Sequence, residues 1–282
     1  MAELRTATAS HEMGMHTEQL AGRSQQRFFE VDPGERRFTY PLAPDVDFNK
    51  RTEFDAAAMD TRGINRKIRE CMNDGYGTIV VHNPGAKHSL GVGILNRLNL
   101  YFEGSLGYFG IGLIDGPNVR VKGRVGWSCA ENMLAGTVLI EKNAGSCFGA
   151  AIRGGDLVCK GDVGARTGID QKGGTIIVGG RTGAFSGFMM QRGRMVVLGD
   201  AGANLGDSMY DGIIYAGGRI ASLGVDAVPT GMTDLDCAWL ERKLMLYGLP
   251  APKPLKEMTK IVAGKQLWNY DNLEPAEKKL VL

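Results

Sequence analysis

Three octapeptides decide the fold of this chain: GDVGARTG at residues 161–168, GRTGAFSG at 180–187 and GDAGANLG at 199–206. Each begins nineteen residues after the one before, and each has glycine at its first, fourth and eighth positions. A fixed period of this length is typical of a repeat architecture. Glycines follow the same step through a long part of the chain, in three series: Gly107, Gly126, Gly145, Gly164, Gly183 and Gly202; Gly136, Gly155, Gly174, Gly193 and Gly212; and Gly149, Gly168, Gly187 and Gly206.

Apolar residues keep the same period. Since residues two apart in a strand point to one face, two such series predict one buried strand face per repeat. The first series is Leu100, Val119, Val138, Leu157, Ile176, Met195 and Ile214. The second is Phe102, Val121, Ile140, Cys159, Val178, Val197 and Ala216. Seven members in each series predict about seven stacked repeats.

Nineteen residues are too few for a strand, a helix and two loops, but they suit one coil of short strands and tight corners. Glycine serves corners that need positive φ and places where neighbouring backbones approach closely. At a spacing of about 4.8 Å, seven coils would form a rod roughly 30 Å long. We therefore predict a mainly β protein with a right-handed parallel β-helix; its hand follows from the general crossover rule.

We predict that the chain divides into three parts: the repeat with the helix before it, and one arm on each side. Residues 1–54 read as a largely irregular N-terminal arm, rich in aromatics and prolines. Residues 55–228 hold a helix at 55–74, a strand at 78–81 and then the β-helix. Residues 229–282 read as a helix at 234–247 followed by a stiff proline-rich linker and an extended tail. Such arms either cap a solenoid or bind a partner.

One polar series lies in an outward phase of the coils. Its alternating charges predict a solvated ladder that supports stacking, with a docking rim for a partner as the alternative. The series is Arg124, Asn143, Asp162, Arg181, Asp200 and Arg219.

Composition excludes several classes. The formal net charge of +2 gives no electrostatic case for nucleic acid binding. We see no apolar run long enough for a membrane span and no secretory signal, so we expect a cytoplasmic location. The five cysteines form neither a disulfide framework nor a zinc pattern, and Cys159 reads as a small core residue.

Residues that could carry chemistry are sparse. The phosphate-loop, dinucleotide, zincin and nucleophile-elbow motifs are absent. The four histidines, His11, His16, His82 and His88, lie outside the periodic coils, and we interpret them as structural or exposed. The carboxylates of Glu131, Glu141, Asp170 and Asp207 suggest no pairing. We therefore expect no catalytic, cofactor-binding or metal site in this chain.

The spacing G-x-x-G-x-x-x-G in the three octapeptides resembles the GXGXG domain. That domain closes the large subunit of glutamate synthase and recurs as the β-helix subunit of formylmethanofuran dehydrogenase. Further stretches are similar to the free-standing glutamate-synthase-like subunits, over about residues 55–228. They are Arg62-Gly63-Ile64-Asn65-Arg66, His82-Asn83-Pro84-Gly85, Ala130-Glu131-Asn132-Met133 and Leu198-Gly199-Asp200-Ala201-Gly202.

Within that family the chain most resembles the β-helix subunits of N-methylglutamate synthases. The resemblance implies a non-catalytic scaffold in a hetero-oligomer that joins methylamine to glutamate and releases ammonia. It implies two partners, an amidotransferase-like subunit and an FMN-binding glutamate-synthase-like subunit, and places the FMN and an iron–sulfur cluster in the latter. It implies no nucleic acid or membrane partner, and it supplies no catalytic residues for this chain.

Two other readings stay open. The chain could be the β-helix subunit of a formylmethanofuran dehydrogenase or formyltransferase–hydrolase complex, where the same fold supports a metal-dependent amidohydrolase. It could also be a stand-alone β-helix enzyme, which needs a catalytic histidine or carboxylate on a coil face.

Overall fold

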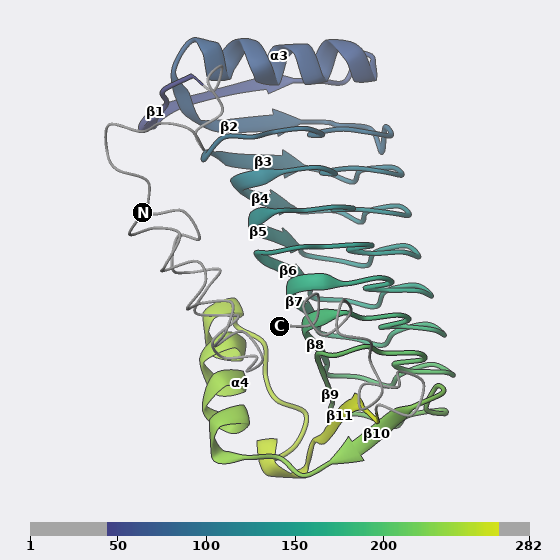
Figure 1. Ribbon diagram of the computed structural model, residues 1–282. Helices are drawn as coiled ribbons and strands as arrows, with labels where there is room; N and C mark the ends of the chain where they lie inside the picture. Colours follow the sequence, from purple (N-terminus) through teal and green to yellow (C-terminus); the bar gives the residue numbers. More distant parts are fainter. Residues whose placement is uncertain (1–43, 265–282) are drawn as a thin grey trace, which may run out of the picture.

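The computed structural model describes residues 44–264 and shows a parallel β-solenoid of about 7 turns (Figure 1). Each turn contributes one strand to a single sheet with the order β1-β2-β3-β4-β5-β6-β7-β8-β9-β11-β10. The strands are β1 (Asp47–Asp55), β2 (Tyr76–His82), β3 (Asn99–Glu103), β4 (Asp115–Val121), β5 (Ala135–Ile140), β6 (Asp156–Cys159), β7 (Lys172–Val178), β8 (Arg192–Val197), β9 (Ile213–Ala216), β10 (Ala227–Thr230) and β11 (Thr259–Ala263).

The nineteen-residue period is confirmed as the register of this sheet. Leu100 pairs with Val119, which pairs with Val138, and the series continues to Ile214 without a shift. The second series, from Phe102 to Ala216, is paired in the same way. Both series are buried in one continuous core inside the solenoid, since each coil has too little apolar surface to form a core alone.

Glycine fills two roles in the coils, as expected. Gly187 lies at φ 72°, in the left-handed region that side chains disfavour. Gly183 has an ordinary φ, but a Cβ atom there would lie 2.4 Å from the backbone nitrogen of Ala165 on the preceding coil. Corners and close stacking therefore require glycine for different reasons.

The corners also contain residues that we did not predict to be left-handed. In one turn Phe109, Ile111 and Leu113 have φ of 57°, 60° and 56°. Their N–H groups donate alternately to the next coil and the previous one, to the carbonyls of Trp127, Leu90 and Glu131. Hydrogen bonds between coils therefore hold a backbone shape that a single coil would not keep.

Helix α3 (Thr61–Asn73) lies across one end of the solenoid (Figure 1). Asp60 caps its start by accepting a hydrogen bond from the N–H of Gly63 at 2.7 Å. Ile64, Ile68, Cys71 and Met72 are buried against the solenoid core. The predicted helix is confirmed, except that it begins at Thr61 and not at residue 55, because residue 55 ends β1 and Asp60 supplies the cap. Helix α3 closes an end that would otherwise expose apolar side chains.

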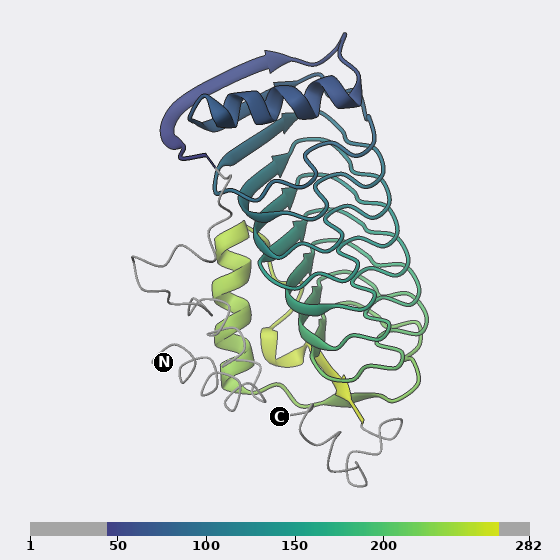
Figure 2. The same cartoon turned by 45° about the horizontal axis from the view of Figure 1, so that its top comes forward.

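The C-terminal part reverses direction and returns to the solenoid. After β10, helix α4 (Asp234–Tyr247) runs along the outer face of the sheet, on the side opposite the corner turns (Figure 2). Strand β11 then inserts between β9 and β10, antiparallel to both. The helix predicted at 234–247 is confirmed. Residues 259–263 of the predicted extended tail pair in the sheet, which we did not predict, because the free edge of β9 offers backbone groups for pairing.

The N-terminal prediction needs a similar correction. Of residues 1–54, only 44–54 are described, and 47–54 belong to β1, which pairs parallel with β2. For these residues the irregular assignment is wrong. Most side chains of β1 are exposed, so its sequence lacks the apolar alternation that identifies a strand. Within the described part of the chain, no helix is long and apolar enough to cross a membrane.

Candidate partner-binding surfaces

The two described histidines make structural contacts; His11 and His16 lie outside the described residues. His82 Nε2 lies 3.4 Å from a carboxylate oxygen of Glu53 on the neighbouring strand. His88 Nδ1 accepts a hydrogen bond from the backbone N–H of Tyr108 at 2.8 Å. Each ring is therefore used to hold one coil to the next.

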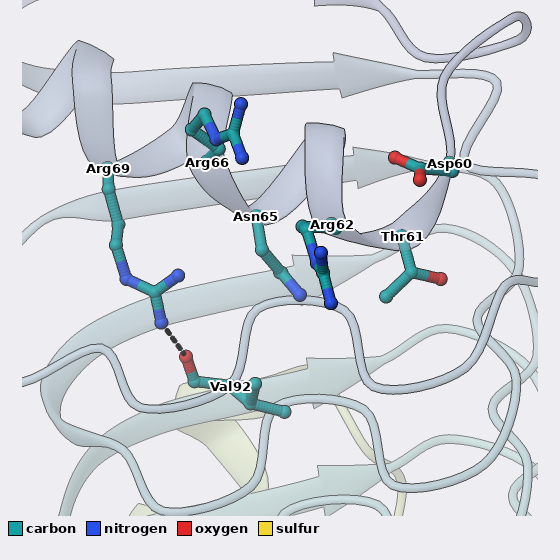
Figure 3. A pocket seen from close by; sticks show the side chains of 7 residues that line it. All are labelled: Asp60, Thr61, Arg62, Asn65, Arg66, Arg69 and Val92. Atoms are coloured by element: carbon teal, nitrogen blue, oxygen red, sulfur yellow. Dashed lines mark hydrogen bonds between the residues drawn. The ribbon is translucent and has the colours of Figure 1, made fainter.

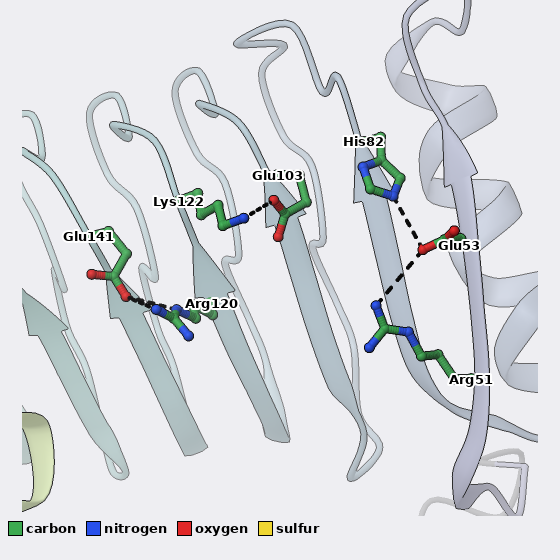
Figure 4. Close-up of polar contacts among 7 residues, drawn as sticks. All are labelled: Arg51, Glu53, His82, Glu103, Arg120, Lys122 and Glu141. Carbon is green, nitrogen blue, oxygen red and sulfur yellow. Dashed lines mark hydrogen bonds and ion pairs between the residues drawn. The ribbon is translucent and has the colours of Figure 1, made fainter.

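A ladder of charges follows the strands from β1 to β6, and Figure 4 shows its members from Arg51 to Glu141. Glu53 lies near both Arg51 and His82, and Lys122 pairs with Glu103. Further along, Glu141 accepts from Arg120 at 2.7 Å and from Lys160 at 2.8 Å. Burial of the Glu141 carboxyl acts to raise its pKa, but Lys160 and Arg120 outweigh this effect and lower it. These charges are satisfied within the solenoid.

The predicted outward series is confirmed as a second ladder. Asp162 accepts from both the backbone N–H and the guanidinium of Arg181, at 2.8 and 3.1 Å. These two bonds lower the pKa of Asp162. Asp200 likewise accepts the backbone N–H of Arg219 at 2.8 Å. The carboxylates thus bind N–H groups one coil away, which favours a stacking role for this series over a docking rim.

Cys159 lies fully buried in β6, which confirms it as a core residue. Burial raises the pKa of its thiol to about 12 and also raises that of Cys129. Both thiols therefore stay protonated and unreactive near neutral pH. Among the described residues, no group of three histidine, cysteine or carboxylate side chains is placed to hold a metal ion.

An exposed aromatic stack lies on the corner turns of the first coils. The rings of His88 and Tyr108 stack at 4.7 Å, and those of Tyr108 and Trp127 at 5.4 Å. Phe109 lies beside them and is 52% exposed, while Trp127 is 58% exposed. We call His88, Tyr108, Phe109 and Trp127 the aromatic corner.

The aromatic corner was not predicted, although the sequence contains a signal for it. Tyr108 and Trp127 stand nineteen residues apart, so the period places them directly above one another. The following coils have small residues at the same phase: Ser146, Ala165, Ala184 and Ala203. The aromatic corner is thus confined to the end of the solenoid that α3 covers.

Helix α3 binds the first corner through one of its faces. Thr61 Oγ1 donates to the carbonyl of His88 at 3.2 Å. Asn65 donates from Nδ2 to the carbonyl of Ser89 at 2.8 Å, and its Oδ1 accepts the N–H of Gly91 at 2.9 Å. Arg69 donates to the carbonyl of Val92 at 3.4 Å. Three side chains of the helix thus fix its position on the solenoid.

Beside this contact lies an open cavity of about 720 Å³ lined by Arg62, Arg66 and Arg69 (Figure 3). Among the described residues that line this cavity, Asp60 supplies the one carboxylate. That carboxylate is already engaged, because it caps the start of α3. Within the described chain, Arg62 and Arg66 have no ion-pair partner. We call Arg62, Arg66 and Arg69 the arginine face.

Helix α4 has apolar residues on two sides. Its inner side packs Trp239, Leu240 and Leu244 against the outer face of the sheet. Its other side exposes Leu235, Met245 and Leu246, which are 63%, 77% and 66% exposed. We call these three residues the α4 outer face. A cavity of about 290 Å³ adjoins Leu246 and reaches Tyr101 and Leu139 on the sheet.

Polar contacts fix α4 in place. Lys243 Nζ donates to both carboxylate oxygens of Asp156 on β6, at 2.8 and 2.5 Å, and Tyr247 Oη donates to one of them at 2.5 Å. At the start of the helix, Asp236 is buried and accepts from Tyr215 Oη at 2.6 Å and from Lys260 Nζ at 2.8 Å. The exposed residues of α4 therefore stand on a firmly held helix.

Comparison with known proteins gives one partial relationship, and no family model matches the chain. The chain is 36% identical over 87 residues to protein GlxC of Rhizobium meliloti (strain 1021). The match covers 30% of this chain and 38% of that protein. The chain therefore spans well under two thirds of the length of this relative.

Proposed function

We propose that this chain is a non-catalytic scaffold subunit of a glutamate-synthase-like enzyme, and specifically of N-methylglutamate synthase. In this role it bridges an amidotransferase-like subunit and a subunit that binds FMN and an iron–sulfur cluster. The similarity to protein GlxC supports a glutamate-synthase-like relationship at the coarse level. The finer assignment rests on the motifs at residues 62–66, 82–85, 130–133 and 198–202.

One observation carries the proposal: large exposed apolar side chains gather on two separate surfaces of one rigid solenoid. The aromatic corner lies on the turns of the first coils, next to α3. Helix α4, which carries the α4 outer face, lies on the opposite side of the sheet from the corner turns (Figure 2), and Leu246 near its end adjoins β3 to β5. Exposed apolar groups that gather on one surface mark sites of protein contact, and a bridge needs two such sites.

Co-purification of the tagged full-length chain from its host tests the proposal. We expect at least two companion chains and a visible absorption spectrum of a flavin. A chain that purifies alone, without a flavin-bearing companion, would contradict it. A companion that is a metal-dependent amidohydrolase would instead identify the chain as the β-helix member of a formyltransferase–hydrolase complex.

The two described histidines distinguish a stand-alone β-helix enzyme from the two subunit functions. His82 and His88 lie before the regular coils and are engaged by Glu53 and Tyr108. A stand-alone enzyme would be favoured over a scaffold by two results together. The isolated chain would show catalytic activity, and His88→Ala would abolish that activity without changing assembly.

A further inference from the structure

We propose that the aromatic corner and the arginine face form one docking surface for an acidic, apolar-anchored segment of one partner subunit. The proposal deepens the scaffold function and rests on it. It assigns a chemistry to one of the two partner sites. The two parts of the surface are connected, because Thr61 at the start of α3 donates to the carbonyl of His88, whose ring begins the aromatic stack.

The arginine face differs from the two ladders because its three arginines line one cavity and most ladder cations are paired. Most lysines and arginines of the two ladders have carboxylate partners within 4 Å, such as Arg120 with Glu141 and Arg181 with Asp162. Arg62 and Arg66 have none among the described residues, although they lie one helical turn apart. Three arginines around one open cavity repel one another, and negative groups from outside the described chain would relieve that repulsion.

The position of Arg62 adds to this argument. The first turn of α3 contains no acidic residue, although the positive end of the helix dipole favours negative charge there. Arg62 stands in that turn, so its charge opposes the dipole, which the N-cap carboxylate of Asp60 alone complements among the described residues that line the cavity. A bound carboxylate would be attracted by the arginines and by the dipole together.

The aromatic corner supplies the apolar half of the surface. Tyrosine, tryptophan and arginine are the residues that most often dominate the binding energy of protein interfaces. Trp127 and Tyr108 are held by stacking on one another and on His88, so they lose little freedom when a partner covers them. Phe109 extends the exposed apolar area on the same turn.

A protein segment fits this surface better than a small ligand or a nucleic acid. The arginines are exposed and the cavity is open, with no buried polar group aimed into it to bind a small anion tightly. The net charge of +2 is far from the basic excess of nucleic-acid-binding domains. The surface combines positive charge with apolar side chains, so its complement carries carboxylates next to apolar side chains.

The α4 outer face has a different character. Leu235, Met245 and Leu246 are aliphatic, and the neighbouring Glu241 and Arg242 balance each other in charge. The partner bound there should therefore attach with little dependence on salt. The surface formed by the aromatic corner and the arginine face is positively charged, whereas the α4 outer face is nearly neutral. This difference in charge gives each partner its own site.

Binding of each co-purified partner to purified full-length variants tests the proposal. R62E/R66E reverses two charges, and W127A removes the main aromatic anchor. R153E/R192E changes two other exposed arginines and serves as the matched control. We expect R62E/R66E and W127A each to weaken binding of the same single partner by at least about tenfold, with the control within about twofold. Wild-type binding of that partner should weaken between 50 and 500 mM NaCl, a dependence that R62E/R66E should reduce.

The proposal is overturned if both partners bind R62E/R66E and W127A as they bind wild type, while the complex itself still forms. That outcome leaves the scaffold function intact. If no partner co-purifies, the scaffold function fails and the surface is tested alone, with a fluorescein-labelled peptide of alternating Glu and Leu. Loss of peptide binding in R62E/R66E supports the surface. Equal binding of a Lys-Leu peptide or of single-stranded DNA to wild type overturns it.

Discussion

At the scale of single residues, Gly202 shows how closely the coils stack. A Cβ atom there would lie 2.5 Å from the carbonyl carbon of Gly183 on the preceding coil. We expect Gly202→Ala to destabilise the protein by more than about 2 kcal/mol, because backbone atoms cannot move aside as a flexible side chain can. Thermal unfolding measures the effect.

Gly231→Ala is the control for that substitution. No atom lies within 4 Å of the position that its Cβ would take, and its φ is not in the left-handed region. We expect an unchanged or slightly raised Tm, since alanine restricts the unfolded chain more than glycine does. Equal losses in the two variants would show that the stacking distance is not the cause.

Asp236 gives the protein a specific sensitivity to acid. Burial acts to raise the pKa of this carboxyl, but hydrogen bonds from Lys260, Tyr215 and Thr233 outweigh it and lower the pKa to about 2. Its unfolded value is about 3.9. The folded pKa is thus the lower one, so Asp236 stabilises the protein fully above about pH 4, and this contribution is lost as pH falls toward 2.

Comparison of wild type with Asp236→Asn across pH tests this assignment. At pH 7 we expect the variant to be less stable by about 3 kcal/mol, because the substitution leaves the nearly buried Lys260 without its carboxylate. The difference in unfolding free energy should shrink between about pH 4 and pH 2. A difference that stays constant over this range would contradict the role of the Asp236 charge.

At the scale of elements, Asn65 joins α3 to the first corner through two hydrogen bonds, to Ser89 and Gly91. We expect Asn65→Ala to cost about 1–3 kcal/mol, because the N–H of Gly91 is left without its acceptor. Amide hydrogen exchange should accelerate at residues 88–93 and stay unchanged in β6–β8. Arg66→Ala, which removes a neighbouring side chain with no ion-pair partner in the described chain, should leave the exchange at both places as in wild type.

Most of the strands that the sequence predicted are those whose residues repeat. Strands β3–β9 follow directly from the paired series that begin at Leu100 and Phe102, since each coil copies the register of the last. Helices α3 and α4 follow from helical spacing and end signals. Strand β11 could not be predicted, because its place between β9 and β10 depends on contacts made after the chain has reversed along α4.

The surfaces were harder to predict than the fold. A sequence shows which residues share a phase but not which of them stay exposed, so Tyr108 and Trp127 were missed. Arg62 and Asn65 were recognised only as part of a motif. The structure separates their roles, because Asn65 hydrogen-bonds to the first corner, whereas Arg62 is exposed beside the cavity. The period identifies which residues form the core. Which of the remaining side chains stay exposed depends on where a capping element such as α3 ends.

At the scale of the whole molecule, the solenoid acts as a spacer of fixed length. Its coils pair in register from β2 to β9. Helix α3 covers one end of the solenoid, and β10 and β11 cover the other (Figure 1). The aromatic corner and the α4 outer face are therefore held in a constant relation to each other. Two proteins bound to them would be kept at a set distance and orientation, which is what the proposed scaffold requires.

The most direct test of this account asks whether the two surfaces hold different partners. The tagged chain is purified from its host as wild type, as Y108A/W127A and as M245S/L246S, and the companions are identified by mass spectrometry. The account predicts that wild type retains both partners and that each double variant loses one, a different one in each case, while remaining folded. Loss of the same partner from both variants, or retention of both partners by both, would contradict the bridge.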